Sequence, residues 1–410
     1  MSKTHLMSKT CLSRRQALGL LATAPALAAT RPAAAAAPVK VGLVLTMSGP
    51  FASSGEIMAN AAKLYLATEG QAVLGEQAVE LIIRDDGGTN PDAAKRLVQE
   101  LVTRDRVQYL GGFQWTPNAN AIGTLLNQAK VPCVLMNASG ANTTRLSPYM
   151  ARTSFTHWQI NMPLGQWAAG TKGYRRAYVL VTDFAPGGDA EAAFTKGFTE
   201  KGGEVVASVR MPIQSPNFVP FLLRAKEAKP DAVFAFHPGG VQASAFMKAY
   251  AEAGLKEAGI QLIGPGDLIS DEELPNIGRA ALGVITAGQY SLAADRPANR
   301  SFVDAWKAAY GFAPVRPNYM AAGAWDGMHA ICTAIAATGG KADPSAAMRA
   351  ISNFTTDASP RGPVSIDPAT RDIVQNVYIR EVRMVGDEPA NVEIETISAV
   401  KDPWKALNPA

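Results

Sequence analysis

The fold of this chain is decided by the stretch VKVGLVL at residues 39–45, because it begins a pattern that later segments repeat. A loop rich in Ser and Gly follows it, and a helix is expected over 55–70. Further short apolar runs, such as VQYL at 107–110 and VPCVLM at 131–136, come after further helical segments. Continuously apolar strands that alternate with helices are typical of a parallel sheet covered by helices on both faces.

The alternation forms two runs of similar plan. In the first run strands are expected at 39–45, 79–84, 107–110 and 131–136, with helices at 55–70, 91–104 and 117–130. In the second run strands are expected at 176–181, 204–210, 231–236, 260–263 and 283–287, with helices at 189–201, 218–229 and 242–253. Helices at 299–310, 318–337 and 344–351 and a β-ribbon at 362–366 and 373–382 complete the chain. About 370 residues follow position 37, which exceeds the size of most single cores, so two lobes are expected.

The N-terminal residues predict export. Basic residues precede the apolar run at 17–22, and the small residues Ala26-Leu27-Ala28 follow as an A-x-A cleavage site, which is typical of a secretory signal. The adjacent Arg14 and Arg15 resemble a twin-arginine signal, and a general secretory signal is the alternative. We expect a signal peptide over 1–37, cleaved at about 28–37, and a soluble periplasmic protein.

Charge and cysteine content exclude other classes of protein. The net charge of +4 becomes −1 without the five basic residues of positions 1–37, so nucleic acid is not an expected partner. Cys133 and Cys332 are predicted to be buried free thiols rather than a disulfide. Neither Cys nor His shows a metal-binding spacing, so neither a metal nor a cofactor is expected.

Seven segments resemble, in order, those of the branched-chain amino acid binding proteins of ABC transporters, which have the type I periplasmic-binding fold. They are VGLVLTMSGPF at 41–51, RDD at 84–86, GGFQWT at 111–116, MNASGAN at 136–142, DAVFAF at 231–236, IGPGD at 263–267, and GPV at 362–364 with Asp367. Each segment is weak evidence alone, but their order and spacing make the resemblance specific over nearly all of the chain after position 37.

The resemblance implies an α/β protein of two Rossmann-like lobes joined by three hinge crossovers, near His157, Gly288 and Asn353. Lobe one would comprise 38–157 and 289–352, and lobe two 158–288 and 353–410. The resemblance also implies that a small molecule binds between the lobes, and that hinge bending closes them over it. The implied partners are a small ligand (an amino acid, amide or aromatic acid) and an ABC permease in the inner membrane, with the protein itself a monomer.

The resemblance implies that two loops of lobe one hold the α-carboxylate of the ligand. Ligands of open α/β sheets bind beyond the carboxyl ends of the strands, where Thr116 and the loop Ser139-Gly140-Ala141-Asn142 are expected. Ser54, in the loop region after the first strand, is included in the expected site. Ser, Asn and Gly also favour ordinary turns, so a purely structural reading of these loops is the alternative.

This sequence departs from the family at several positions. Trp115 and Ala141 stand where branched-chain amino acid binders usually carry a hydroxyl residue, and Gly88 and Gln114 stand near the cysteines of a family disulfide. Trp115 could stack on a planar ligand, or it could pack beneath its loop.

Lobe two contributes four expected ligand-binding residues. Phe184 and Pro186 follow a strand, and Pro186 or its neighbour replaces a tyrosine common in the family. His237 ends another strand, where it could contact the ligand or hold a turn. Asp267 stands near the family's carboxylate for a ligand ammonium, unless it is solvated instead.

The sequence fits three possible functions to different degrees: a transport receptor, a sensor and an exported enzyme. A transport receptor explains every feature without catalytic residues, and none is expected. A sensor of the same fold is not distinguished by the sequence. An exported cofactor enzyme is disfavoured, because Met47-Ser48-Gly49-Pro50 stands after the first strand where a G-x-G-x-x-G motif would be needed.

Overall fold

A computed structural model of the chain describes Met1 and residues 37–214, 217–313 and 315–409. The arginine pair and the cleavage site of the predicted signal peptide therefore lie outside the described residues. Pro38–Ala410 form one compact unit, which contains two sheets.

The first sheet is five-stranded and parallel, in the order β2-β1-β3-β4-β5. Its strands are β1 (Val39–Leu45), β2 (Val79–Asp85), β3 (Tyr109–Gly112), β4 (Cys133–Leu135) and β5 (Met150–Arg152). Sequence analysis assigned no strand to β5, whose three residues are too few to show a pattern. Val41 pairs with Leu81 on one side and Tyr109 on the other, so the decisive first stretch lies at the centre of this sheet.

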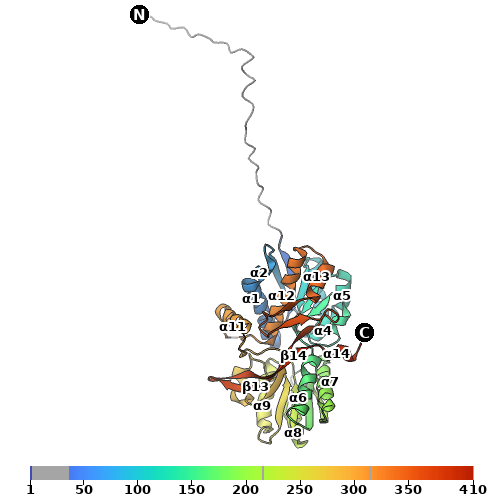
Figure 1. The fold of residues 1–410 in the computed structure, drawn as a ribbon, viewed down its shortest axis with the longest axis vertical. Coiled ribbons are helices and arrows are strands. Elements are labelled where there is room, and N and C mark those ends of the chain that lie inside the picture. Colours follow the sequence, from blue (N-terminus) through green and yellow to red (C-terminus); the bar gives the residue numbers. More distant parts are fainter. Residues whose placement is uncertain (2–36, 215–216, 314, 410) are drawn as a thin grey trace. The chain divides into compact units, whose positions relative to one another are not determined.

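Helices from two separate parts of the chain pack around the first sheet. They are α1 (Ala52–Tyr65), α2 (Gln71–Leu74), α3 (Pro91–Thr103), α4 (Thr116–Ala121), α5 (Gly123–Ala129), α11 (Pro297–Tyr310), α12 (Tyr319–Thr338) and α13 (Pro344–Ser352). The start of α3 shows why the sequence is helical there, because the Asn90 side chain accepts a 3.0 Å hydrogen bond from the Ala93 N–H. Figure 1 shows α12 and α13, in orange, beside the blue α1 and α2. The Tyr65 and Trp325 rings join α1 to α12 at 5.1 Å.

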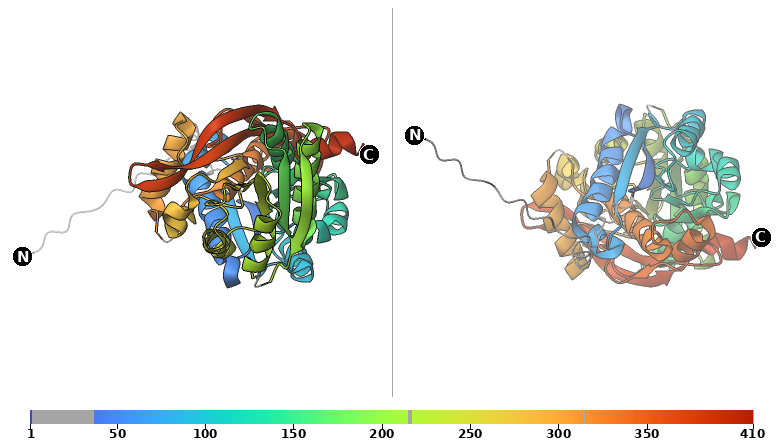
Figure 2. Two further views of the ribbon diagram at one scale, coloured as in Figure 1. Left: turned by 90° about the horizontal axis from the view of Figure 1, so that it is seen from below. Right: turned by 90° about the horizontal axis from the view of Figure 1, so that it is seen from above.

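The second sheet has nine strands, of which β7, β6, β8, β9 and β10 are parallel and the remaining four extend it in antiparallel fashion. The parallel strands are β6 (Arg176–Thr182), β7 (Glu204–Met211), β8 (Ala232–Phe236), β9 (Gln261–Pro265) and β10 (Ile285–Gly288). The others are β11 (Thr355–Thr356), β12 (Val364–Ile366), β13 (Ile373–Val385) and β14 (Glu388–Val400). Figure 2 shows the β13–β14 hairpin as a long red ribbon. The expected ribbon lacked β14, although the two-residue turn Gly386-Asp387 is a hairpin signal.

The helices associated with the second sheet include one that the sequence did not reveal. They are α6 (His157–Gly170), α7 (Ala185–Glu200), α8 (Val219–Glu227), α9 (Val241–Ala253), α10 (Leu274–Ile277) and α14 (Pro403–Leu407). Helix α6 was missed because it is buried almost all round and contains Pro163, which is a helix-breaking residue. It packs closely on α7, since a Cβ added at Gly165 would lie 2.5 Å from the Phe194 carbonyl oxygen.

The chain passes between the two sheets three times: after β5, after β10 and after α13. This confirms the predicted α/β fold with three crossovers. Arg361, which follows the third passage, is fully buried and lies 2.7 Å from the Asp326 carboxylate on α12. The same guanidinium donates to the Thr153 and Ser154 carbonyls beside the first passage, so one side chain joins two crossovers.

Candidate functional site

The loops after the parallel strands of both sheets meet around one small cavity. It is lined by Gln114, Trp115, Thr116, Asn137, Ser139, His157, Phe184, Pro186, Phe236, Pro238, Asp267, Tyr319 and Met320. Its volume is about 30 Å³, on the order of the space that one water molecule occupies in the liquid. The two halves of the molecule are therefore closed upon each other at this point.

Six of the residues expected at the ligand site line this cavity: Trp115, Thr116, Ser139, Phe184, Pro186 and Asp267. Five others do not: Ser54, Gly140, Ala141, Asn142 and His237. Asn142 is exposed and Ser54 is buried within α1. Three residues that sequence reasoning did not assign to the ligand, His157, Phe236 and Tyr319, complete much of the lining.

Thr116 joins the two loops of the first sheet. Its buried hydroxyl oxygen accepts hydrogen bonds from the backbone N–H groups of Ser139, at 3.2 Å, and of Gly140, at 3.0 Å. A hydroxyl has two acceptor sites and one proton, so the Thr116 proton is left for another acceptor. Gly140 permits the approach of the loops, because a Cβ there would lie 2.5 Å from the Thr116 methyl carbon.

Trp115 is fixed from behind by a buried polar chain. Its indole N–H donates to the Thr46 hydroxyl at 2.9 Å, and that hydroxyl donates to the Asp86 carboxylate at 2.7 Å. The Asn118 amide donates to the other Asp86 oxygen at 2.9 Å. The ring of Phe51 meets Trp115 edge-on at 4.9 Å. Trp115 is thus packed beneath its loop and also lines the cavity.

The second loop of the first sheet is bound by the second half of the molecule. The Ala141 N–H donates to the Asp189 carboxylate of α7 at 3.0 Å, and the Trp158 indole donates to the other Asp189 oxygen at 3.3 Å. Burial raises the pKa of Asp189. In this closed structure the Ala141 N–H, which was expected to donate to a ligand carboxylate, therefore donates to the Asp189 carboxylate instead.

A row of rings, here called the aromatic wall, runs along the cavity through Tyr319, Phe155, His157, Phe236 and Phe184. Successive ring centroids are 5.8, 5.3, 4.5 and 5.8 Å apart. All members except Phe155 line the cavity. The wall combines side chains from α12, the first crossover, β8 and the loop before α7, so only the tertiary fold brings them together.

His157 is a neutral member of the aromatic wall. Burial and the nearby positive charge of Arg152 lower the pKa of His157 to about 3. The Asn161 side-chain amide lies 3.3 Å from Nδ1. With that amide donating to Nδ1, the ring proton is on Nε2, which makes His157 an uncharged hydrogen-bond donor beside the cavity.

Asp267 is the one acidic side chain among the residues lining the cavity. Its Oδ1 accepts a 2.9 Å hydrogen bond from the Tyr319 hydroxyl, which comes from the other side of the cavity. Burial raises the pKa of Asp267 to about 6, and the Tyr319 hydrogen bond and the charge of Arg380 oppose that rise. Arg380 can lie close behind the Asp267 loop because residue 266 is glycine, where a Cβ would be 2.9 Å from the guanidinium.

His237 lies in a buried turn outside the cavity. Its Nδ1 accepts a 3.2 Å hydrogen bond from the Gly239 N–H, and its ring packs 5.3 Å from that of Phe246. Burial lowers the pKa of His237 to about 3, so the ring is neutral. The position fits the turn-holding alternative that the sequence left open.

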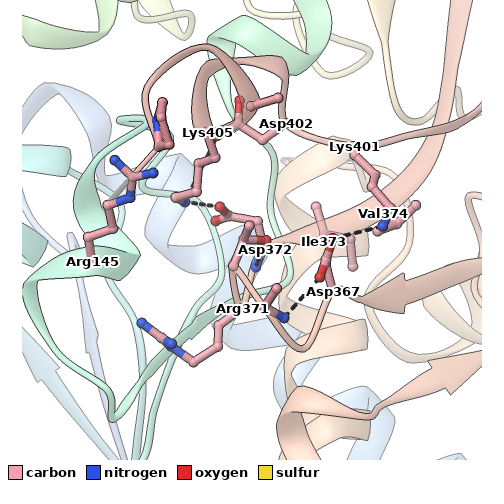
Figure 3. A pocket seen from close by; sticks show the side chains of 13 residues that line it. Arg145, Asp367, Arg371, Asp372, Ile373, Val374, Lys401, Asp402 and Lys405 are labelled. Carbon is pink, nitrogen blue, oxygen red and sulfur yellow. Dashed lines mark hydrogen bonds and ion pairs between the residues drawn. The ribbon is translucent and has the colours of Figure 1, made fainter.

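A larger cavity, of about 580 Å³, lies beside the crossovers, between the residues before β13 and helix α14 (Figure 3). Two ion pairs lie within its lining: Lys405 with Asp372, and Lys401 with Asp367 at 2.9 Å. The guanidinium groups of Arg145 and Arg371 donate instead to backbone carbonyls. Asp372 also lies 3.0 Å from the buried guanidinium of Arg152. These ion pairs connect α14 to the crossovers.

Two features are absent from the described part of the chain. Within it, no group of three or more His, Cys, Asp or Glu side chains is arranged to hold a metal ion. No described helix is both long enough and apolar enough to cross a membrane. Cys133 and Cys332 are buried and unbridged, as expected.

Two sheets joined by three crossovers, with a cavity where their strand-end loops meet, define the class of two-lobed ligand-binding proteins. The family of periplasmic binding proteins matches residues 38–388, and this chain belongs to it. A Leu/Ile/Val-binding protein homolog from Brucella abortus is 44% identical over 366 residues, which cover 89% of this chain and 93% of the relative.

Solved structures show the same similarity. A solute-binding protein of an ABC transporter from Rhodopseudomonas palustris BisB5, in complex with 3,4-dihydroxybenzoic acid, is 46% identical with a TM-score of 0.85. The match covers 90% of this chain and 99% of that one. A solute-binding protein from R. palustris in complex with 4-hydroxybenzoate is 40% identical, also with a TM-score of 0.85, and the match covers 89% of this chain and 98% of that one.

Proposed function

We propose that this protein is the solute-binding component of an ABC importer, that it captures a small aromatic carboxylate between its lobes, and that it delivers this ligand to an inner-membrane permease. The observation that carries the proposal is the aromatic wall, which faces the hydroxyl-bearing loops of the first sheet across one cavity. Flat rings suit a flat apolar ligand through offset or edge-to-face contacts.

The carboxylate end of the ligand is assigned to the loops of Thr116 and Ser139. Thr116 has a proton to donate, since its oxygen already accepts two backbone N–H bonds. The ligand carboxylate is not expected at the opposite end of the cavity, because Asp267 is there and two carboxylates repel each other in a closed site. The bound ligand therefore has one orientation, with its carboxylate toward the first sheet.

Ligand entry requires the halves to separate. Pockets for small molecules usually enclose about 300–1,000 Å³, whereas this cavity measures about 30 Å³. We assign the moving lobes to 38–157 with 289–352 and to 158–288 with 353–410. The Ala141–Asp189 and Tyr319–Asp267 hydrogen bonds would break on opening. X-ray scattering with and without a saturating ligand tests this motion, and identical curves would contradict it.

An amino acid is the second candidate ligand. Asp267 could receive an ammonium group, and the similar Brucella protein carries the name of a Leu/Ile/Val-binding homolog. Calorimetric titration of the protein from Pro38 onward with benzoate, 4-hydroxybenzoate, leucine and phenylalanine separates the two candidates. Binding of a benzoate but not of leucine is the expected result, and the reverse pattern would overturn the aromatic assignment.

The cellular setting belongs to the same proposal. We assign the chain to the periplasm as an exported monomer that leaves the cytoplasm through the twin-arginine route. A strain without the gene should lose uptake of the ligand, whereas a sensor would alter gene expression and leave uptake intact. Export that continues in a strain without the twin-arginine translocase would exclude that route.

A further inference from the structure

Asp267 has hydrogen-bonding capacity in the cavity that the chain does not use. Its Oδ1 accepts from the Tyr319 hydroxyl and its own backbone N–H also bonds to the carboxylate, but among the described residues no second side chain donates to it. An ionised carboxylate accepts at both oxygens, so a ligand group that carries a proton would be held there. The proposed function leaves this end of the cavity without an assigned ligand group.

Arg380 explains how a negative charge can persist at that end. This arginine is buried, donates to the Thr286 hydroxyl at 3.1 Å and to the Tyr290 carbonyl, and has one guanidinium nitrogen without a partner among the described residues. It lies behind the Gly266–Asp267 backbone and stabilises the carboxylate through its charge. With a pKa of about 6, Asp267 is mostly ionised at neutral pH and accepts hydrogen bonds.

The rest of the cavity indicates which group of the ligand would donate a hydrogen bond to Asp267. The ligand ring lies along the aromatic wall with its carboxylate at Thr116, so the group that reaches Asp267 is a substituent on the far part of the ring. A hydroxyl fits, because it donates one proton without adding charge, and a hydrogen bond from a hydroxyl to a buried carboxylate is stronger than one between neutral groups. An unsubstituted ring would remove water from Asp267 and return no hydrogen bond.

We infer that Asp267, held in place by Tyr319, accepts a hydrogen bond from a hydroxyl group on the ligand ring. The ligand class is therefore hydroxybenzoates rather than benzoate itself. This inference rests on the proposed function, which it narrows. Asp267 is the acceptor and contacts the ligand, whereas Tyr319 is a positioning residue that keeps the carboxylate directed into the cavity.

The test compares ligands that differ only in the proton donor. Dissociation constants of benzoate, 4-fluorobenzoate, 4-hydroxybenzoate and 3,4-dihydroxybenzoate are measured by calorimetry for the wild type, Asp267→Asn and Tyr319→Phe. The wild type should prefer the hydroxylated ligands by roughly 10- to 100-fold over benzoate and 4-fluorobenzoate. Asp267→Asn should reduce this preference to less than about 3-fold, and benzoate itself should bind a few-fold more tightly because the variant has no charge that opposes the ligand carboxylate.

Tyr319→Phe is the matched control, because it keeps the Asp267 carboxylate and removes the hydroxyl group that positions it. The hydroxyl preference should persist at roughly 10-fold in this variant. If the preference for hydroxylated ligands persisted in Asp267→Asn and vanished in Tyr319→Phe, the inference would be overturned. Tyr319 would then be the residue that recognises the hydroxyl group. Equal wild-type binding of benzoate and hydroxybenzoates would overturn the inference as well and leave the aromatic proposal intact. Binding of leucine with no binding of any benzoate would instead refute the proposed function.

Discussion

Two cavities in the described part of the chain differ in size and in the groups that line them. The larger one, beside the crossovers, is lined by Asp372 and Lys405, which form an ion pair (Figure 3). Asp372 also lies 3.0 Å from the buried Arg152 guanidinium. The small one, between the sheets, is lined by the Gln114 and Asn137 side chains, whose buried amide oxygens have no partner among the described residues. Buried polar groups are nearly always paired, so these two amide oxygens are exceptions at the small cavity. In the larger cavity Asp402 Oδ2 also lacks a hydrogen bond, but it lies 3.9 Å from the Lys405 ammonium.

The largest expected effect tests the structural role of the crossover cavity. Asp372→Ala leaves Arg152 and Lys405 buried without their shared counterion, which should lower the free energy of unfolding by about 3–5 kcal/mol. Glu191→Ala, which breaks an exposed ion pair with Arg210, should cost no more than about 1 kcal/mol. Urea unfolding measures both. If ligand affinity in Asp372→Ala fell and stability did not, the crossover cavity would be a binding site after all.

A second prediction concerns the loop that receives the ligand carboxylate. Thr116→Ala removes the donor and also two backbone contacts between the loops, so binding of the aromatic carboxylate should weaken by about 1–2 kcal/mol. Ser139→Ala, which retains the backbone N–H bond to Thr116, should weaken binding by about 1 kcal/mol. Calorimetric titration gives both values. Wild-type affinity in both variants would place the carboxylate elsewhere.

Trp115 tests whether ring contacts select the ligand. Trp115→Ala should weaken an aromatic carboxylate by about 1 kcal/mol more than an aliphatic one of similar length, since only the former has a ring to contact the indole. Because the change also frees the Thr46 hydroxyl, the melting temperature should fall. Equal losses for the two ligands would show that Trp115 only supports its loop.

The smallest expected effect is one of pH. Asp267 has a pKa raised to about 6 by burial, so it gains a proton as the pH falls from 7.5 to 5.5 and no longer repels the ligand carboxylate. Benzoate should therefore bind a few-fold more tightly at the lower pH, with the effect absent in Asp267→Asn. Three other charged or titratable groups act near Asp267: Tyr319, Arg380 and Glu272. Burial raises the pKa of Glu272 to about 7, so Glu272→Gln is the control variant.

Sequence reasoning found the cavity loops but not all of its side chains. Trp115, Thr116 and Ser139 follow apolar strands, and the rule that sites form at strand ends was enough to place them. His157 and Tyr319 gave no such signal, because each begins a helix whose position over the cavity depends on a crossover. Ala141 was expected at the ligand site, but its N–H donates to Asp189, a residue that the sequence placed only at the start of a helix.

The sequence alone predicted the two α/β runs and their parallel sheets, since short apolar strands and the helices between them are local patterns that need no distant partner. The tertiary structure decided which side chains share the cavity. Tyr319 and Asp267 are 52 residues apart, and Trp115 and Thr46 are 69 apart, yet each pair is joined by one hydrogen bond. The first pairing depends on how the crossovers close one half upon the other, and the second depends on the pairing of β1 with β3. No local pattern in the sequence specifies either contact.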